Sequence, residues 1–157
     1  MNKNPKPITI LMADDDAEDR QLTKEAFEEN CLGNDLRFVE NGEEMLDYLN
    51  RRGKFTDPKT SPRPGLILLD LNMPRMDGRE ALREMKADPR FKSIRVVVMT
   101  TSQAEEDIAH TYNLSASSYI TKPVTFEGLL EVIRVLGKYS LEIVHLPETP
   151  DDSTVRQ

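Results

Sequence analysis

Polar residues that could act together in chemistry stand at the ends of short apolar runs in this sequence. Each of these runs is followed by a carboxylate, a hydroxyl or an ammonium group, and the residues are Asp14, Asp15, Asp16, Asp70, Thr100 and Lys122. Carboxylate oxygens suit a hard divalent cation such as Mg²⁺. An ammonium and a hydroxyl are donors that can hold phosphoryl oxygens. The residue types therefore indicate metal-assisted phosphoryl chemistry, provided that the fold brings them together.

The apolar runs alternate with amphipathic segments, which predicts five strand–helix units in succession. Strands are predicted at 8–13, 36–39, 66–69, 94–99 and 117–121. Helices are predicted at 17–30, at 43–51, at 79–87, after Ser102, and at 126–136 with an end at Gly137. Such alternation requires right-handed crossovers and a sheet covered on both faces. The expected fold class is α/β, a five-stranded parallel sheet with five helices.

A parallel sheet of this kind would gather the polar residues. The carboxyl ends of its strands lie along one edge, and ligands bind there. Residues far apart in the sequence, such as Asp14 and Lys122, are therefore expected to meet. Taken alone, Lys122 could be an exposed lysine and Thr100 an ordinary β-branched strand residue. Their shared position at the ends of strands favours a functional site.

The acidic residues at this edge create an electrostatic problem. Two like charges about 4 Å apart repel by roughly 4 kcal/mol at an effective dielectric constant of about 20. Asp14, Asp15 and Asp70 therefore need a cation or raised pKa values, and Mg²⁺ can join carboxylates to a substrate phosphate. A carboxylate beside Mg²⁺ can attack phosphorus and form an acyl phosphate. Aspartate also caps helices, so at least one acid of 14–16 is expected to cap the helix at 17–30.

Composition limits the classes of function. The 157 residues suit one domain, and 21 Lys and Arg against 28 Asp and Glu give a net charge of −7. An acidic chain lacks the clustered basic surface that binds nucleic acid. The apolar runs are too short to cross a membrane. The single cysteine, Cys31, favours a reducing compartment. We expect a cytoplasmic protein with no nucleic-acid or membrane partner.

Four stretches of the sequence resemble a known family. In the order that the family has, they are ILMADDD at 10–16, LLDLNMPRMDG at 68–78, MTTS at 99–102 and YITKP at 119–123. Together they resemble the receiver domain of two-component response regulators, and the resemblance covers residues 7–138. It implies a flavodoxin-like fold with strand order 2-1-3-4-5. It also implies that Asp70 accepts the phosphoryl group.

The resemblance implies roles for the remaining site residues. Mg²⁺ would be bound by Asp14, Asp15, Asp70 and the backbone carbonyl of Asn72. Lys122 resembles the lysine of the family's site. Thr100 and Tyr119 resemble its switch pair, which responds to phosphorylation. The implied function is a response regulator that accepts a phosphoryl group from a histidine kinase, catalyses only its own phosphorylation and dephosphorylation, and signals through protein contacts.

Two further segments resemble a subgroup of this family. The proline-containing loop at 53–64 and the segment 139–147 are similar to single-domain regulators paired with bacterial phytochromes. This similarity implies a phytochrome-type kinase, and a homodimer formed through the arm and the face made by helix four, strand five and helix five. Too few residues follow Gly137 for a DNA-binding output module. The expected organisation is an N-terminal tail at 1–6, the receiver domain at 7–138, a C-terminal arm at 139–147 and a polar tail at 148–157.

Three other classes remain open. A phosphatase of the haloacid dehalogenase type also uses an aspartate nucleophile, Mg²⁺ and a lysine. It has a second aspartate two positions after the nucleophile, where this sequence has Asn72, and its acidic pair comes last in the chain. A flavodoxin-type electron carrier needs a phosphate-binding loop after the first strand, where three aspartates would repel a phosphate. A structural adaptor without phosphorylation would have no need of Asp70, Thr100 and Lys122 together.

Overall fold

The fold is organised around one parallel sheet. The computed structural model describes residues 8–71, 73–100 and 118–139. The strands are β1 (Thr9–Ala13), β2 (Asp35–Val39), β3 (Leu66–Asp70), β4 (Arg95–Thr100) and β5 (Ser118–Thr121). All neighbouring strands pair in parallel, in the order β2-β1-β3-β4-β5. This arrangement confirms the predicted fold class and strand order.

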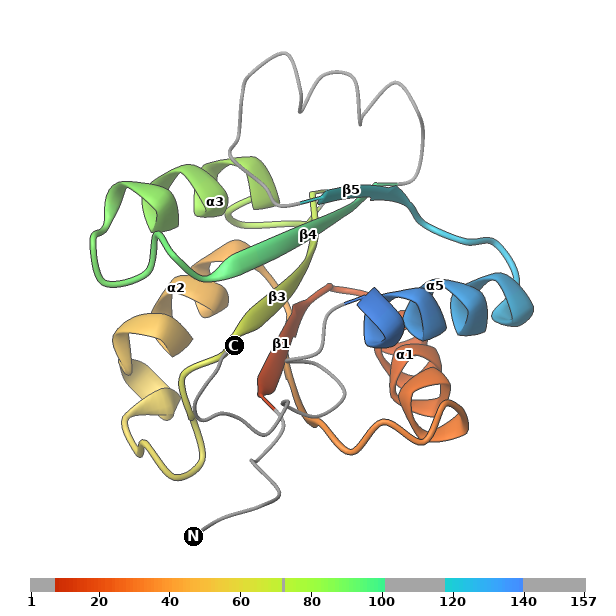
Figure 1. Cartoon of the computed structure of the whole chain (residues 1–157). Helices are drawn as coiled ribbons and strands as arrows, with labels where there is room; N and C mark the ends of the chain where they lie inside the picture. The colour runs from red at the N-terminus through yellow and green to blue at the C-terminus, as the bar shows by residue number, and fades with distance from the viewer. Residues whose placement is uncertain (1–7, 72, 101–117, 140–157) are drawn as a thin grey trace, which may run out of the picture.

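Helices cover both faces of the sheet (Figure 1). Helices α1 and α5 lie side by side on one face, and α2 and α3 lie together on the other. Their bounds, with those of a short 3₁₀ helix η1, are α1 (Ala17–Glu29), α2 (Gly42–Asn50), η1 (Gly53–Phe55), α3 (Gly78–Ala87) and α5 (Phe126–Tyr139). The helix expected after Ser102 would fall in 101–117, outside the described residues. None of the described helices is long and apolar enough to cross a lipid bilayer.

Helix α5 corrects one prediction. The predicted end at Gly137 is wrong, because the helix continues to Tyr139. A glycine typically ends a helix by adopting a left-handed conformation. Gly137 keeps a helical backbone and is buried, and within the described residues Gly53 is the glycine that has a positive φ. A packed glycine inside a helix and a terminal glycine look alike in sequence.

The central strands are apolar on both faces because both faces are covered. Along β1, Ile10 and Met12 pack into the core on the α1 and α5 side, whereas Leu11 and Ala13 pack into the core on the α2 and α3 side. Every residue of β3 is buried. Burial of this kind fixes the strands relative to one another. The residues at their carboxyl ends are therefore held on a rigid support.

Tight turns at the carboxyl edge keep the strand ends close to the helix starts. Asp77 caps α3 by accepting a hydrogen bond from the Glu80 amide at 3.1 Å. The Gly78 amide donates to the Leu71 carbonyl at 3.0 Å, so the chain folds back over the end of β3. A Cβ at Gly78 would lie 2.5 Å from the Asp70 carbonyl oxygen. Glycine is required at position 78, because any side chain would push this loop away from Asp70.

Candidate functional site

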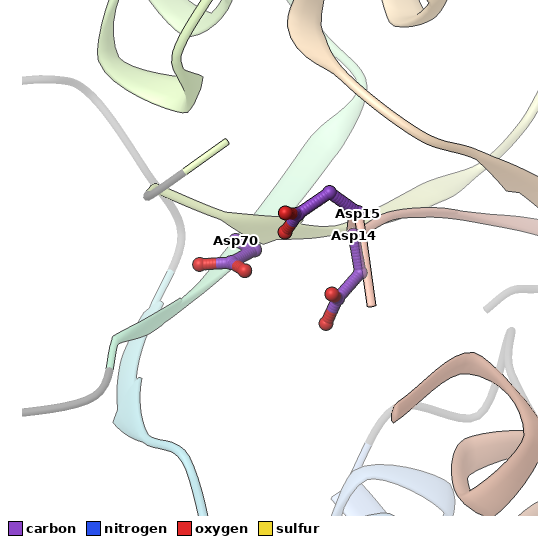
Figure 2. Close-up of side chains that lie close together, drawn as sticks. All are labelled: Asp14, Asp15 and Asp70. Atoms are coloured by element: carbon purple, nitrogen blue, oxygen red, sulfur yellow. The ribbon is translucent and has the colours of Figure 1, made fainter. Parts of the chain in front are cut away.

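Three carboxylates meet at the carboxyl edge of the sheet. Asp14 and Asp15 follow β1, and Asp70 is the last residue of the neighbouring strand β3. One oxygen from each carboxylate lies within 4.8 Å of the other two. Figure 2 shows the three side chains gathered at the ends of these strands. The structure thus brings together the three acids that the sequence predicted to converge.

The third consecutive acid after Asp14 and Asp15 has a different role. Asp16 is the N-cap of α1, where its Oδ1 accepts hydrogen bonds from the amides of Glu18 at 2.8 Å and Asp19 at 3.2 Å. The Asp16 amide donates in turn to Asp14 Oδ1 at 2.9 Å. Helix capping therefore accounts for one of the three acids, as expected. The other two remain available for the cluster.

Asp14 is the most buried acid of the cluster. Its residue is 0% exposed, whereas Asp15 is exposed to solvent. Burial raises the pKa of Asp14 to about 6, and the nearby charge of Asp70 acts in the same direction. The Asp16 amide and the Lys122 ammonium favour the ionised form and offset part of this increase in pKa. Asp14 thus ionises close to neutral pH.

Lys122 brings a positive charge into the cluster. Its Nζ lies 3.1 Å from Asp14 Oδ2, 3.2 Å from Asp70 Oδ2 and 2.8 Å from Asp19 Oδ2. Burial of the side chain would lower the pKa of this ammonium, but the hydrogen bond to Asp19 and the charges of Asp14 and Asp70 outweigh that effect. The pKa of Lys122 therefore lies above its usual value. The lysine stays protonated at any physiological pH.

The donor set fits a hard divalent cation. Carboxylate oxygens are the ligands that Mg²⁺ and Mn²⁺ prefer. Asp14 Oδ2 is buried and accepts no hydrogen bond among the described residues, although the Lys122 ammonium lies at ion-pair distance. The exposed carboxylate of Asp15 lines the solvent side of the cluster. Asp14, Asp15 and Asp70 could therefore hold a cation that reaches the site from solvent and leaves room for further ligands.

Other predicted site residues lie partly or wholly outside the described residues. Asn72 is outside them. Thr100 ends β4 opposite Thr121, so its backbone is at the same edge of the sheet, directly beside the position that precedes Lys122. Tyr119 is placed on β5 by its backbone, opposite Val98. For Thr100 and Tyr119 the structure describes the backbone and not the side chain, so the roles expected of these two residues stay predictions.

Two residues that contact the site were not predicted from the sequence. Asp19 hydrogen bonds to Lys122, and Arg20 donates to the Asp14 backbone carbonyl at 2.7 Å. Both stand in the first turns of α1, among charged residues that are typical of a solvated helix face. A weak signal was present, because a helix that starts at the site edge must direct part of its first turn toward the site. The sequence alone does not tell which residue that is.

Comparison with known proteins identifies the family. The family model for the response regulator receiver domain matches residues 10–134. The chain belongs to the response regulator receiver family. This match contains both acidic stretches of the site and the lysine after β5. The resemblance inferred from the four sequence stretches is therefore confirmed.

Similar proteins include regulators associated with phytochromes. Response regulator Rcp1 from Synechocystis is 38% identical over 144 residues, which cover 92% of this chain and 95% of that protein. The crystal structure of the phosphorylated cyanobacterial phytochrome response regulator RcpA has 37% identity and a TM-score of 0.77, and the match covers 90% of this chain and 99% of that one. The Mn²⁺-bound form of Rcp1 has 37% identity and a TM-score of 0.75 with the same coverage. This chain thus resembles regulators that consist almost entirely of the matched domain.

Proposed function

We propose that this protein accepts a phosphoryl group from a histidine kinase onto Asp70, with a divalent cation bound by the neighbouring acids. The observation that carries the proposal is the arrangement around Asp70. Its Oδ2 lies 3.2 Å from the Lys122 ammonium, and an oxygen of the same side chain lies within 4.8 Å of Asp14 and Asp15 oxygens. A nucleophile, a cation site and a donor for phosphoryl oxygens are thus combined in one place.

The proposed transfer is a displacement at phosphorus. A carboxylate oxygen of Asp70 forms the new P–O bond while the P–N bond of a phosphohistidine breaks, and the leaving imidazole takes up a proton. Asp14, Asp15 and Asp70 would hold the cation, which would neutralise charge at the phosphoryl oxygens. Lys122 donates a hydrogen bond to one of those oxygens and keeps the site attractive to an anion. Water can later cleave the acyl phosphate, so the protein acts on its own aspartate and turns over no separate substrate.

Two relatives support the chemistry of this proposal. One similar structure is described as phosphorylated and the other as Mn²⁺-bound. We infer that this chain uses Mg²⁺ in the cell and accepts Mn²⁺ in its place, because both ions prefer oxygen ligands. We also propose a phytochrome-type histidine kinase as the donor, because the similar regulator RcpA is named for a phytochrome.

A protein donor would find an apolar contact beside the site. Val124 is 98% exposed, directly after the Lys122–Pro123 segment. Val124 also lines a cavity of about 270 Å³ between α1 and the start of α5, where apolar side chains such as Leu22 and Phe126 lie beside charged ones such as Asp19 and Lys122. Replacing Val124 with lysine should slow phosphorylation by a kinase severalfold and leave phosphorylation by a small phosphodonor unchanged. Equal slowing with both donors would contradict a docking role for Val124.

The output is proposed to be a conformational switch. The Thr100 hydroxyl would turn toward the phosphoryl group, Tyr119 would turn inward, and the face around β5 and α5 would change its partners. A shift of this kind needs only a ligand that binds one of two states more tightly. Tyr119 with the same rotamer in the presence and absence of a phosphoryl mimic would contradict it. The expected homodimer, formed through the arm at 139–147 and the face made by helix four, β5 and α5, stays a proposal. Residues 101–117, where helix four is expected, and 140–147 of the arm lie outside the described residues.

The competing enzyme function has less support. A phosphatase of the haloacid dehalogenase type would share the nucleophile and cation, but the family match assigns this chain to response regulators. Steady turnover of a generic phosphomonoester would favour the phosphatase. A single phosphorylation without turnover would favour the regulator.

The test of the proposed function uses a small phosphodonor such as acetyl phosphate with Mg²⁺. The wild-type protein should gain one acid-stable, base-labile phosphoryl group, and a chelator should prevent the gain. Asp70→Asn should lose labelling completely while it keeps the fold, because the two side chains are nearly isosteric. Asp35→Asn is the matched control, since Asp35 is an exposed acid on β2 that pairs with Arg37. Wild-type labelling of Asp70→Asn would contradict the proposal.

A further inference from the structure

The ammonium of Lys122 is shared among three carboxylates, and one of them stands outside the proposed cation site. Asp14 and Asp70 belong to that site, whereas Asp19 does not. Yet Asp19 makes the shortest of the three contacts, at 2.8 Å between Lys122 Nζ and Asp19 Oδ2. The Asp19 side chain is 35% exposed, and the Lys122 side chain is 17% exposed. Asp19 is therefore the partner of Lys122 that lies nearest to solvent.

The local structure explains why Asp19 reaches the lysine. Asp16 caps the start of α1 and accepts a hydrogen bond from the Asp19 amide, which fixes Asp19 in the first turn of the helix. Lys122 follows β5 directly and leads into the segment before α5. Because α1 and α5 lie side by side on one face of the sheet (Figure 1), the first turn of α1 faces the end of β5.

Lys122 and a divalent cation compete for the same oxygens. An ammonium has three protons to donate, and in this structure three carboxylates accept them or lie at ion-pair distance. A cation that binds Asp14 and Asp70 repels the ammonium and takes over the charge of these two acids. Asp19 is then the carboxylate of the three that still balances Lys122. Without Asp19, the ammonium would depend on Asp14 and Asp70 alone and would oppose the cation.

We propose that Asp19 is a positioning residue that holds the Lys122 ammonium so that Asp14 and Asp70 stay available to a divalent cation. This inference rests on the proposed function, because it concerns the same cation site. It predicts that Asp19 acts on metal affinity through Lys122 and not through direct coordination. The charge that Asp19 contributes is useful because it is paired with the lysine.

The test is a Mn²⁺ titration of the full-length protein without any phosphodonor, followed by the electron paramagnetic resonance signal of free Mn²⁺. Asp19→Asn should weaken Mn²⁺ binding by about fivefold to tenfold, the size of coupling expected between groups in contact. Glu18→Gln is the matched control, because it removes an adjacent exposed charge that no hydrogen bond or ion pair joins to Lys122 among the described residues. That control should change the affinity by less than about twofold, since solvent and salt screen an exposed charge.

A double-mutant cycle separates action through Lys122 from a general effect of charge. In a Lys122→Met background, Asp19→Asn should change the Mn²⁺ affinity no more than Glu18→Gln does. With Lys122 present, Asp19→Glu should bind Mn²⁺ more tightly than Asp19→Asn does, because the glutamate carboxylate can still reach the ammonium. An unchanged affinity for Asp19→Asn, or an equal loss in the Lys122→Met background, would overturn the inference while the proposed function stands. A wild-type protein that binds no Mn²⁺ would overturn both.

Discussion

Two partly buried lysines at opposite edges of the sheet have ammonium groups with different kinds of partner. Lys86, in the last turn of α3, donates from its Nζ to the backbone carbonyls of Lys92 at 2.9 Å and Ile94 at 2.7 Å, just before β4 begins. Burial lowers the pKa of Lys86, and no carboxylate in the described part of the chain forms an ion pair with it. Lys122 is also partly buried, but acidic neighbours more than offset the effect of burial on its pKa.

The difference lies in the partners. Neutral carbonyls satisfy the hydrogen bonds of Lys86 and tie a loop to a helix, but they bring no charge that must be balanced. Carboxylates around Lys122 bring more negative charge than one ammonium can neutralise. The amino-terminal edge of β4 therefore carries no excess negative charge around its lysine, whereas the site edge carries an excess that a cation could neutralise.

Replacing Lys122 with methionine should give the largest effect on stability. The change leaves buried Asp14 and Asp70 without their ammonium, and removal of one partner from a buried ion pair is strongly destabilising. We expect the free energy of unfolding at pH 7 to fall by about 2–4 kcal/mol in the presence of a chelator. Mg²⁺ should recover part of the loss, because a cation can replace the ammonium. Denaturation by urea, followed by circular dichroism, measures both values.

Equal stability of Lys122→Met and the wild-type protein in chelator would show that the acids do not depend on the lysine. Recovery of stability with Na⁺ at equal ionic strength would show that Mg²⁺ acts only through screening. Either result would remove the distinction between the two edges.

Removing Asp15 should weaken cation binding with little effect on the fold. Asp15 is exposed, so its loss leaves no cavity. Even residues that only orient metal ligands contribute about tenfold to affinity, and a direct ligand should contribute at least as much. We expect Asp15→Ala to lower Mg²⁺ affinity by at least about tenfold. The rate of phosphorylation should fall by a similar factor when Mg²⁺ is below saturation. Asp16→Asn is the control in calorimetry, because asparagine keeps the helix cap. Unchanged Mg²⁺ affinity in Asp15→Ala would exclude Asp15 as a ligand.

The pH dependence of cation binding should follow Asp14. Its pKa is raised to about 6, chiefly by burial, so a proton must leave before the buried carboxylate can bind a metal. Apparent Mg²⁺ affinity should therefore be constant above about pH 7 and should fall by up to about tenfold per pH unit below pH 6. Calorimetric titrations between pH 5 and 8 would measure this profile. A Mg²⁺ affinity that stays constant down to pH 5, as expected for an acid with the ordinary aspartate pKa of 3.8, would indicate that Asp14 is not the acid that controls binding.

Lys86→Met should have the smallest effect. Its two hydrogen bonds to neutral carbonyls contribute about 1 kcal/mol in net terms, and methionine fills the same apolar space. Stability should fall by about that amount, equally with and without Mg²⁺. Cation affinity and phosphorylation should stay at wild-type values. A Mg²⁺-dependent loss of stability would mean that the two edges are coupled.

Much of this architecture could be predicted from the sequence, because the signals are local. Alternating apolar and amphipathic segments located the five strands within a residue or two, and the convergence of Asp14, Asp70 and Lys122 follows from the geometry of a parallel sheet. Contacts that depend on the direction of a single side chain could not be predicted. Nothing in the sequence showed that Asp19 turns toward Lys122. Likewise, helix periodicity does not reveal that a buried Gly137 continues α5.

The central claim, that Asp70 accepts a phosphoryl group in a cation-dependent reaction, is tested most directly by locating that group. The wild-type protein would be treated with acetyl phosphate and Mg²⁺, reduced with borohydride and mapped by mass spectrometry of its peptides. Reduction converts an aspartyl phosphate to homoserine, so the account predicts homoserine at position 70, and none when a chelator replaces Mg²⁺. Homoserine at another aspartate, or equal conversion of Asp70 in chelator, would contradict the account.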